Sequence, residues 1–219
     1  MQSNHRNCRF VVLISGQGSN LNAIVQKCRM QGVVADFVQV ISNQPDAPGI
    51  KWAEQQGIQT RVLSHRAFDS RESFDQALGD LIEACDPDYV ILAGFMRILT
   101  AGFVQRFENR LINIHPSLLP AFTGLHTHER ALESAVGWHG CTVHFVTAQL
   151  DHGPIIAQAA LEVHDNDTPQ SLAQRVLELE HRLYPEVVCW LAQGRVELDA
   201  AGLVKVHGIT QRHLKGYSL

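Results

Sequence analysis

The alternation of short apolar runs with amphipathic segments constrains the fold of this chain more than any other feature. The run "FVVLIS" at 10–15 is continuously apolar, stops at "GQGSN", and is followed by apolar residues at helical spacing over 21–28. The same order of strand, turn and helix recurs as far as the apolar run at 89–94. Strands that are apolar on both faces and alternate with helices are typical of a parallel sheet covered on each side. We therefore predict an α/β fold with a Rossmann-like open, mostly parallel sheet and helices on both faces.

The second half of the chain predicts a change in strand direction. After a strand at 111–116, two further strand candidates at 141–146 and 154–163 are separated only by "TAQLDHG". Such a connection is too short for a crossover helix, so we expect the C-terminal strands to be partly antiparallel. A long helix is predicted from Pro169 to Leu191, with Thr168 as its cap.

Length and composition limit the classes of protein that need to be considered. A chain of 219 residues with 45% hydrophobic residues predicts one folded domain. A net charge of −4 does not favour a protein that binds nucleic acid or an anionic membrane. Five scattered cysteines and the lack of a long apolar segment or secretory signal predict free thiols and a cytoplasmic location.

The first glycine-rich turn is a candidate phosphate site. Gly18, Ser19 and Asn20 open the first predicted helix, where free backbone N–H groups and the helix dipole attract an anion. The segment has only a G-x-G pattern, without the third glycine of a dinucleotide fingerprint or the Lys-Ser/Thr of a P-loop. An ordinary helix cap without a ligand is the alternative.

A second candidate site lies at the end of the strand at 111–116. Side chains alternate along a strand, so Asn113 and His115 share one face, and Pro116 restricts His115 to extended geometry. At the carboxyl end of a parallel strand, an amide and an imidazolium could both donate to a developing oxyanion. The alternative is that both side chains only satisfy loop carbonyls.

Other polar residues admit two interpretations. Asp151 is either a turn residue or a carboxylate that orients His115 and favours its protonated form. Four histidines raise the possibility of zinc, but their spacing fits no compact ligand motif, so we predict no metal. These histidines are His126, His128, His139 and His144.

Five segments together resemble one known family. In order they are "VLISGQGSNLNAI", "ILAGFMRILT", "INIHPSLLPAFTGLHTH", "CTVHFVTAQLDHGPII" and "LEHRLYP". They are similar to the successive motifs of the phosphoribosylglycinamide formyltransferase family and extend from Val12 to Pro185. The resemblance implies a catalytic domain at 8–192, and we expect residues 193–219 to form an extension packed on the same domain.

The resemblance implies transfer of a formyl group from 10-formyltetrahydrofolate to the amine of 5'-phosphoribosylglycinamide, in purine synthesis. It implies that Asn113, His115 and Asp151 are catalytic, that Gly18, Ser19 and Asn20 hold the phosphate, and that Glu180 binds the glycinamide end. Leu177 departs from a polar residue that some relatives have three positions before Glu180. The residues implied for the folate co-substrate are Arg71, Met96, Arg97, Ile98, Leu99, Asn113, Thr147, Ala148, Gln149, Leu150 and Asp151.

Three other functions remain open at this point. Formyltetrahydrofolate hydrolysis would use a similar site, but those enzymes usually have a second His where this chain has Pro116. Methionyl-tRNA formyltransfer would need a larger basic C-terminal region. A non-catalytic nucleotide-binding module would not need Asn113, His115 and Asp151 together. We expect small-molecule substrates as the only partners besides a second copy of the chain in a homodimer.

Overall fold

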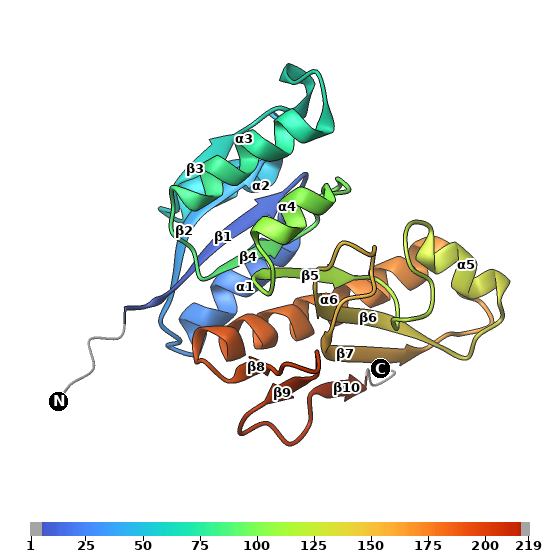
Figure 1. Cartoon of the computed structure of the whole chain (residues 1–219). Coiled ribbons are helices and arrows are strands. Elements are labelled where there is room, and N and C mark those ends of the chain that lie inside the picture. Colours follow the sequence, from blue (N-terminus) through green and yellow to red (C-terminus); the bar gives the residue numbers. More distant parts are fainter. Residues whose placement is uncertain (1–5, 216–219) are drawn as a thin grey trace.

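The computed structural model describes residues 6–215, which form a central eight-stranded sheet flanked by helices (Figure 1). The strand order is β10-β7-β6-β5-β4-β1-β2-β3, and β8 and β9 form a separate two-stranded sheet. The strands are β1 (Cys8–Ile14), β2 (Ala35–Ser42), β3 (Thr60–Val62), β4 (Tyr89–Leu92), β5 (Leu111–His115), β6 (Trp138–Phe145), β7 (Ile155–Glu162), β8 (Val196–Leu198), β9 (Val204–Val206) and β10 (His213–Lys215).

Two of the longer helices begin at a residue whose side chain caps the first turn. Ser70 caps α3 and Thr168 caps α6, each in a capping box with the Ser at the third helical position. The long helix predicted from Pro169 therefore starts as expected and continues to Ala192. The helices are α1 (Ser19–Met30), α2 (Pro48–Gln55), α3 (Arg71–Glu83), α4 (Ala101–Arg106), α5 (Thr127–Glu133) and α6 (Pro169–Ala192), with a short 3-10 helix at His65–Ala67.

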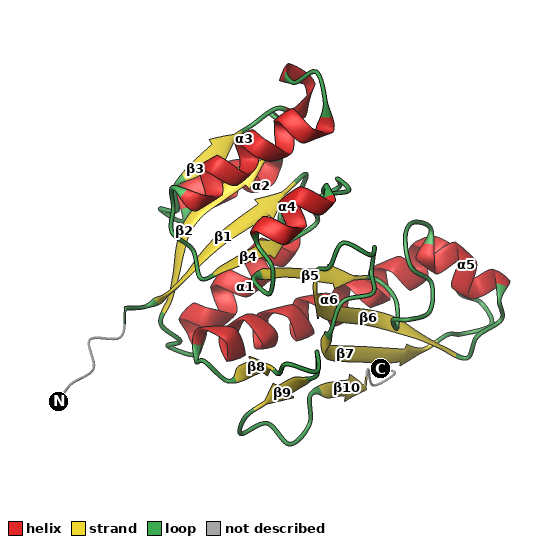
Figure 2. Ribbon diagram, in the orientation of Figure 1, coloured by secondary structure: helices red, strands yellow, loops and turns green. Residues whose placement is uncertain are grey.

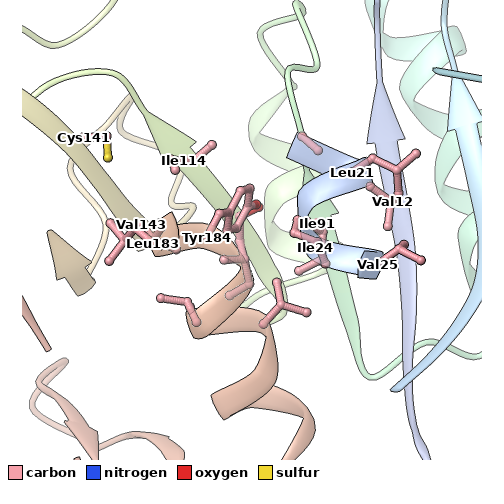
Figure 3. Close-up of a cluster of buried hydrophobic side chains, with 14 of the residues drawn as sticks. Val12, Leu21, Ile24, Val25, Ile91, Ile114, Cys141, Val143, Leu183 and Tyr184 are labelled. Atoms are coloured by element: carbon pink, nitrogen blue, oxygen red, sulfur yellow. The ribbon is translucent and has the colours of Figure 1, made fainter. Parts of the chain in front are cut away.

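Strand β1 is buried on both faces, which explains its continuous apolar sequence. Phe10, Val12 and Ile14 pack into a core with α1, α2 and α6, whereas Val11 and Leu13 pack into a second core with α3 and α4. Figure 3 shows part of the first core, where side chains from α1, α6 and the sheet meet. Two helical layers thus enclose the sheet, and the predicted α/β class is confirmed.

The change in strand direction occurs at β5. Strands β1 to β5 pair in parallel, whereas β6 is antiparallel to both β5 and β7. The β6–β7 connection closes tightly, because a Cβ on Gly153 would lie 1.7 Å from the carbonyl oxygen of Phe145. The predicted antiparallel C-terminal strands are therefore confirmed.

Tyr184 of α6 joins the helix layer to the centre of the sheet. Its side chain is fully buried, and its hydroxyl lies 3.1 Å from the carbonyl oxygen of Leu92 and 3.0 Å from that of Ile112. These carbonyls belong to β4 and β5, so α6 is fixed against the two strands that lead into the candidate site (Figure 3).

Several short elements were not predicted from the sequence. They are α4, α5 and the three strands after α6 (Figure 2). Strand β10 pairs in parallel with β7, and side chains of the β8–β9 hairpin pack against the core that contains α6. The boundary at residue 192 stays a prediction, and positions 216–219 of the expected extension lie outside the described residues. Among residues 6–215, no helix has the length and apolar character needed to cross a bilayer.

Candidate active site

The glycine-rich turn after β1 is packed against the start of α2. Gly18 precedes α1 with a φ of 71°, and a Cβ there would lie 2.9 Å from the Cα of Gly49. The backbone N–H of Gly49 donates to the carbonyl of Gly16 at 3.1 Å. Only glycine fits this conformation and this close approach. The first turn of α1 also contains no carboxylate in its sequence, so its backbone N–H groups remain suitable for an anion.

Asn20 connects this turn to α6. Its Nδ2 donates to Oε2 of Glu180 at 2.8 Å, and both side chains are buried. Burial disfavours the ionised carboxyl and raises the pKa of Glu180 to about 7, although the bond from Asn20 opposes that shift. The structure thus brings together two residues that the sequence places 160 positions apart. Leu177 is partly exposed on α6, one turn before Glu180.

Asn113 is held by a histidine on the neighbouring strand. In the antiparallel register of β5 and β6, Asn113 lies opposite His144, and its Nδ2 is 3.4 Å from His144 Nε2. His144 Nδ1 lies 2.8 Å from the carbonyl oxygen of Phe145, to which it can only donate. Burial lowers the pKa of His144, so the neutral ring accepts from Asn113 at Nε2. One N–H of the Asn113 amide remains for another acceptor.

His115 is buried with both ring nitrogens facing acceptors. Its Nε2 is 2.9 Å from the carbonyl oxygen of Phe122, and its Nδ1 is 3.6 Å from Oδ2 of Asp151. Only 7% of each of the His115 and Asp151 side chains is exposed. Nε2 is thus within hydrogen-bond distance of its carbonyl acceptor, and Nδ1 is within ion-pair distance of the Asp151 carboxylate.

Asp151 reaches His115 because the β6–β7 connection folds over the loop that follows β5. Oδ2 of Asp151 accepts a hydrogen bond from the backbone N–H of Gly124 at 2.8 Å. The residue has a φ of 55°, which Asp tolerates better than most residues. The two predicted catalytic residues His115 and Asp151 therefore contact each other, and both contact the same loop through its backbone.

Apart from Asn113 on β5, the residues implied for folate lie on two loop segments and one helix. Met96 is 77% exposed, Ile98 57% and Leu150 50%, an arrangement suited to covering an apolar ligand. The guanidinium of Arg97 stacks over the ring of Phe74 in α3, 4.5 Å from its centroid. The remaining residues implied for folate lie on the same elements: Leu99 beside Ile98, Thr147, Ala148 and Gln149 in the β6–β7 connection, and Arg71 exposed at the first position of α3.

The histidines considered for zinc do not form one cluster. His128 Nδ1 and His139 Nε2 are 3.2 Å apart, but His126 pairs with Glu129 and His144 with Asn113. Burial lowers the pKa of His139 to about 4, so the pair is neutral near pH 7. Within residues 6–215, no three His, Cys, Asp or Glu side chains are grouped as ligands for a metal ion.

Sequence reasoning missed the residues that support the site. His144 was considered only as a zinc ligand, although its position opposite Asn113 follows from the register of β5 and β6. The backbone groups of Phe122 and Gly124 carry no sequence signal for their role at the site. Their contacts depend on the path of the loop after Pro116, and no local pattern indicates that path.

Comparison with known proteins identifies the family. The formyl transferase model matches residues 8–188. The chain is 49% identical over 189 residues to phosphoribosylglycinamide formyltransferase from Escherichia coli (strain K12), which covers 86% of this chain and 89% of that protein. It is 43% identical over 199 residues to the trifunctional purine biosynthetic protein adenosine-3 from Bos taurus, covering 91% of this chain but only 20% of that protein.

A solved structure agrees with these relatives. The crystal structure of phosphoribosylglycinamide formyltransferase from Anaplasma phagocytophilum superposes with a TM-score of 0.88 at 40% identity, covering 97% of this chain and 100% of that one. The resemblance found in the sequence motifs is confirmed, and this chain belongs to the formyl transferase family.

Proposed function

We propose that this protein transfers the formyl group of 10-formyltetrahydrofolate to the amine of 5'-phosphoribosylglycinamide. The observation that carries the proposal is the convergence of Asn113, His115 and Asp151, with His115 buried between an acceptor carbonyl and a carboxylate. The family and the names of the similar proteins support formyl transfer in purine biosynthesis.

The chemistry of the reaction matches the groups present. Attack of an amine on a formyl carbon produces a tetrahedral oxyanion, which needs preorganised donors. The free N–H of Asn113 and the imidazolium of His115 supply them once the formyl oxygen takes the place of the Phe122 carbonyl at His115. Asp151 stabilises the imidazolium, and through a water molecule it receives the proton that the attacking amine must lose. Collapse of the tetrahedral intermediate then breaks the bond between the formyl carbon and the folate nitrogen, which takes up that proton and leaves as tetrahydrofolate. No step requires a metal ion.

The two substrates bind to different elements of the fold. The phosphate binds at the N–H groups of Gly18, Ser19 and Asn20, and Glu180 contacts the glycinamide end. The folate lies against Met96 to Leu99 and the segment from Thr147 to Asp151. We further propose that the enzyme acts as a homodimer in the cytoplasm, where its five cysteines, all within the described residues, stay as free thiols. Sedimentation velocity at several concentrations tests the dimer.

A coupled spectrophotometric assay tests the function directly. The change in folate absorbance is followed with 10-formyltetrahydrofolate in the presence and absence of 5'-phosphoribosylglycinamide. We expect turnover only when both substrates are present. Turnover without the nucleotide would instead identify a hydrolase, and no turnover under either condition would favour a binding module.

A further inference from the structure

Ser15 fastens the turn at which the chain leaves β4. Gly94 lies in a bend with a φ of 75°, and Ser15 binds both Gly94 and the residue two positions after it. The backbone N–H of Ser15 donates to the carbonyl of Gly94 at 3.1 Å, and the backbone N–H of Met96 donates to Ser15 Oγ at 2.8 Å. Ser15, the residue directly after β1, thus fixes the position of the Met96 backbone.

Asn43 sets the direction of the Ser15 hydroxyl. Ser15 Oγ donates its proton to Oδ1 of Asn43 at 2.6 Å. The lone pairs of Oγ are therefore free to accept the hydrogen bond from the backbone N–H of Met96. Asn43 is 2% exposed and follows β2. Its Nδ2 and its backbone carbonyl oxygen each lie 3.2 Å from His65 Nδ1, so Asn43 is also in contact with the segment after β3. The chain of bonds therefore joins the ends of β1, β2 and β4.

The far end of the same segment is also held by a buried side chain. The backbone N–H of Thr100 donates to Oδ2 of Asp75 at 2.7 Å, and Asp75, on α3, is 3% exposed. Between these two anchors, the side chains of Met96 and Ile98 remain exposed. Fixed backbone with exposed apolar side chains is the arrangement of a preformed ligand surface rather than of a solvated loop.

We infer that Ser15 is a positioning residue for the formyl donor, and that it acts through the backbone of Met96 with Asn43 as its support. The inference rests on the proposed function, because it assigns the segment 94–100 to the folate. Ser15 directs none of its hydrogen bonds at the groups proposed to bind phosphate, although it lies next to Gly16. Loss of the Ser15 hydroxyl should therefore raise KM for the formyl donor more than KM for the nucleotide.

The test compares Ser15→Ala with Ser15→Thr, which keeps the hydroxyl. Loss of one hydrogen bond should raise KM for 10-formyltetrahydrofolate about three- to tenfold in Ser15→Ala. KM for the nucleotide and kcat should change less than about twofold, and Ser15→Thr should restore most of the donor KM. Ser42→Ala is the matched control, because the buried Ser42 hydroxyl lies beside Asn43 and, among residues 6–215, bonds only to Gln44.

Hydrogen exchange of the segment 94–100 gives a readout independent of activity. The amide of Met96 should exchange faster in Ser15→Ala than in wild type or in Ser42→Ala. An unchanged donor KM, or equal increases in both KM values, would overturn the inference while leaving the proposed function intact. A wild-type enzyme that transfers no formyl group would reject the proposed function, and with it the assignment of this segment to the donor.

Discussion

Replacing Glu180 with Gln should stabilise the protein at alkaline pH and weaken nucleotide binding. Glu180 is 8% exposed, and burial raises its pKa from an ordinary 4.5 to about 7. A folded-state pKa above the unfolded value means that the folded state holds a proton that the unfolded state releases. The contribution of Glu180 to stability is therefore fully present below about pH 4.5 and is lost as the pH rises through about 7. Each pH unit between the two pKa values corresponds to about 1.4 kcal/mol, so the loss in the free energy of unfolding amounts to about 3 kcal/mol.

Urea denaturation of the wild type and Glu180→Gln at pH 5 and pH 8 measures this effect. Other groups titrate over the same range, but their contribution cancels when the variant is compared with wild type at each pH. The free energy of unfolding of the variant minus that of wild type should be larger at pH 8 than at pH 5 by about 2–3 kcal/mol. Glu178→Gln serves as the control, since it removes the same charge from an exposed position on the same helix.

If the free energies of unfolding of variant and wild type differ by the same amount at both pH values, the reasoning from burial is refuted. The kinetic part is separate: loss of the carboxylate should raise KM for the nucleotide, with less effect on KM for the folate. A more stable variant with an unchanged nucleotide KM would mean that Glu180 is a buried structural acid for Asn20 and not a substrate ligand.

Three further outcomes are expected. Asn113→Ala and His115→Ala should each lower kcat by on the order of 10²–10³ while circular dichroism shows an intact fold, and near-normal turnover would contradict their roles. Asp151→Asn should keep the bond from Gly124 and so change the urea midpoint little, yet it should greatly reduce kcat, because the amide cannot stabilise an imidazolium. Gly18→Ala should lower the free energy of unfolding by roughly 1–3 kcal/mol through its positive φ and its approach to Gly49. Gly16→Ala is the control for that substitution, because its Cβ would meet nothing within 4 Å.

The fold could be predicted where its causes are local. The continuous apolar run of β1 indicates burial on two faces, and Thr168 with Pro169 marks the start of α6. Helices α4 and α5 have six and seven residues, too few for a clear helical period. Strand β10 has three residues and exists because β7 offers it an edge, a condition that depends on the finished sheet.

The site shows the same division. Asn113 and His115 could be paired from strand alternation alone, since they lie two positions apart on one strand. The contact between His115 and Asp151 spans 36 positions, so the residues alone left it as one of two interpretations of Asp151, and the structure places the two side chains 3.6 Å apart. The bonds from Asn43 through Ser15 to Met96 depend on three strand ends meeting, and they could not be predicted from any single segment.

The pairing of β10 with β7 also covers an edge of β7 that would otherwise be open to a strand from another molecule. The match to the family model ends at residue 188, and the strand that covers β7 lies beyond it. Without β10, the backbone N–H and C=O groups of Gln158 to Ala160 would line an open sheet edge, beside apolar residues that belong to the core. Open edges of this kind recruit strands from other molecules. A shortened enzyme ending at residue 192 would thus keep every proposed catalytic group and yet be prone to aggregate.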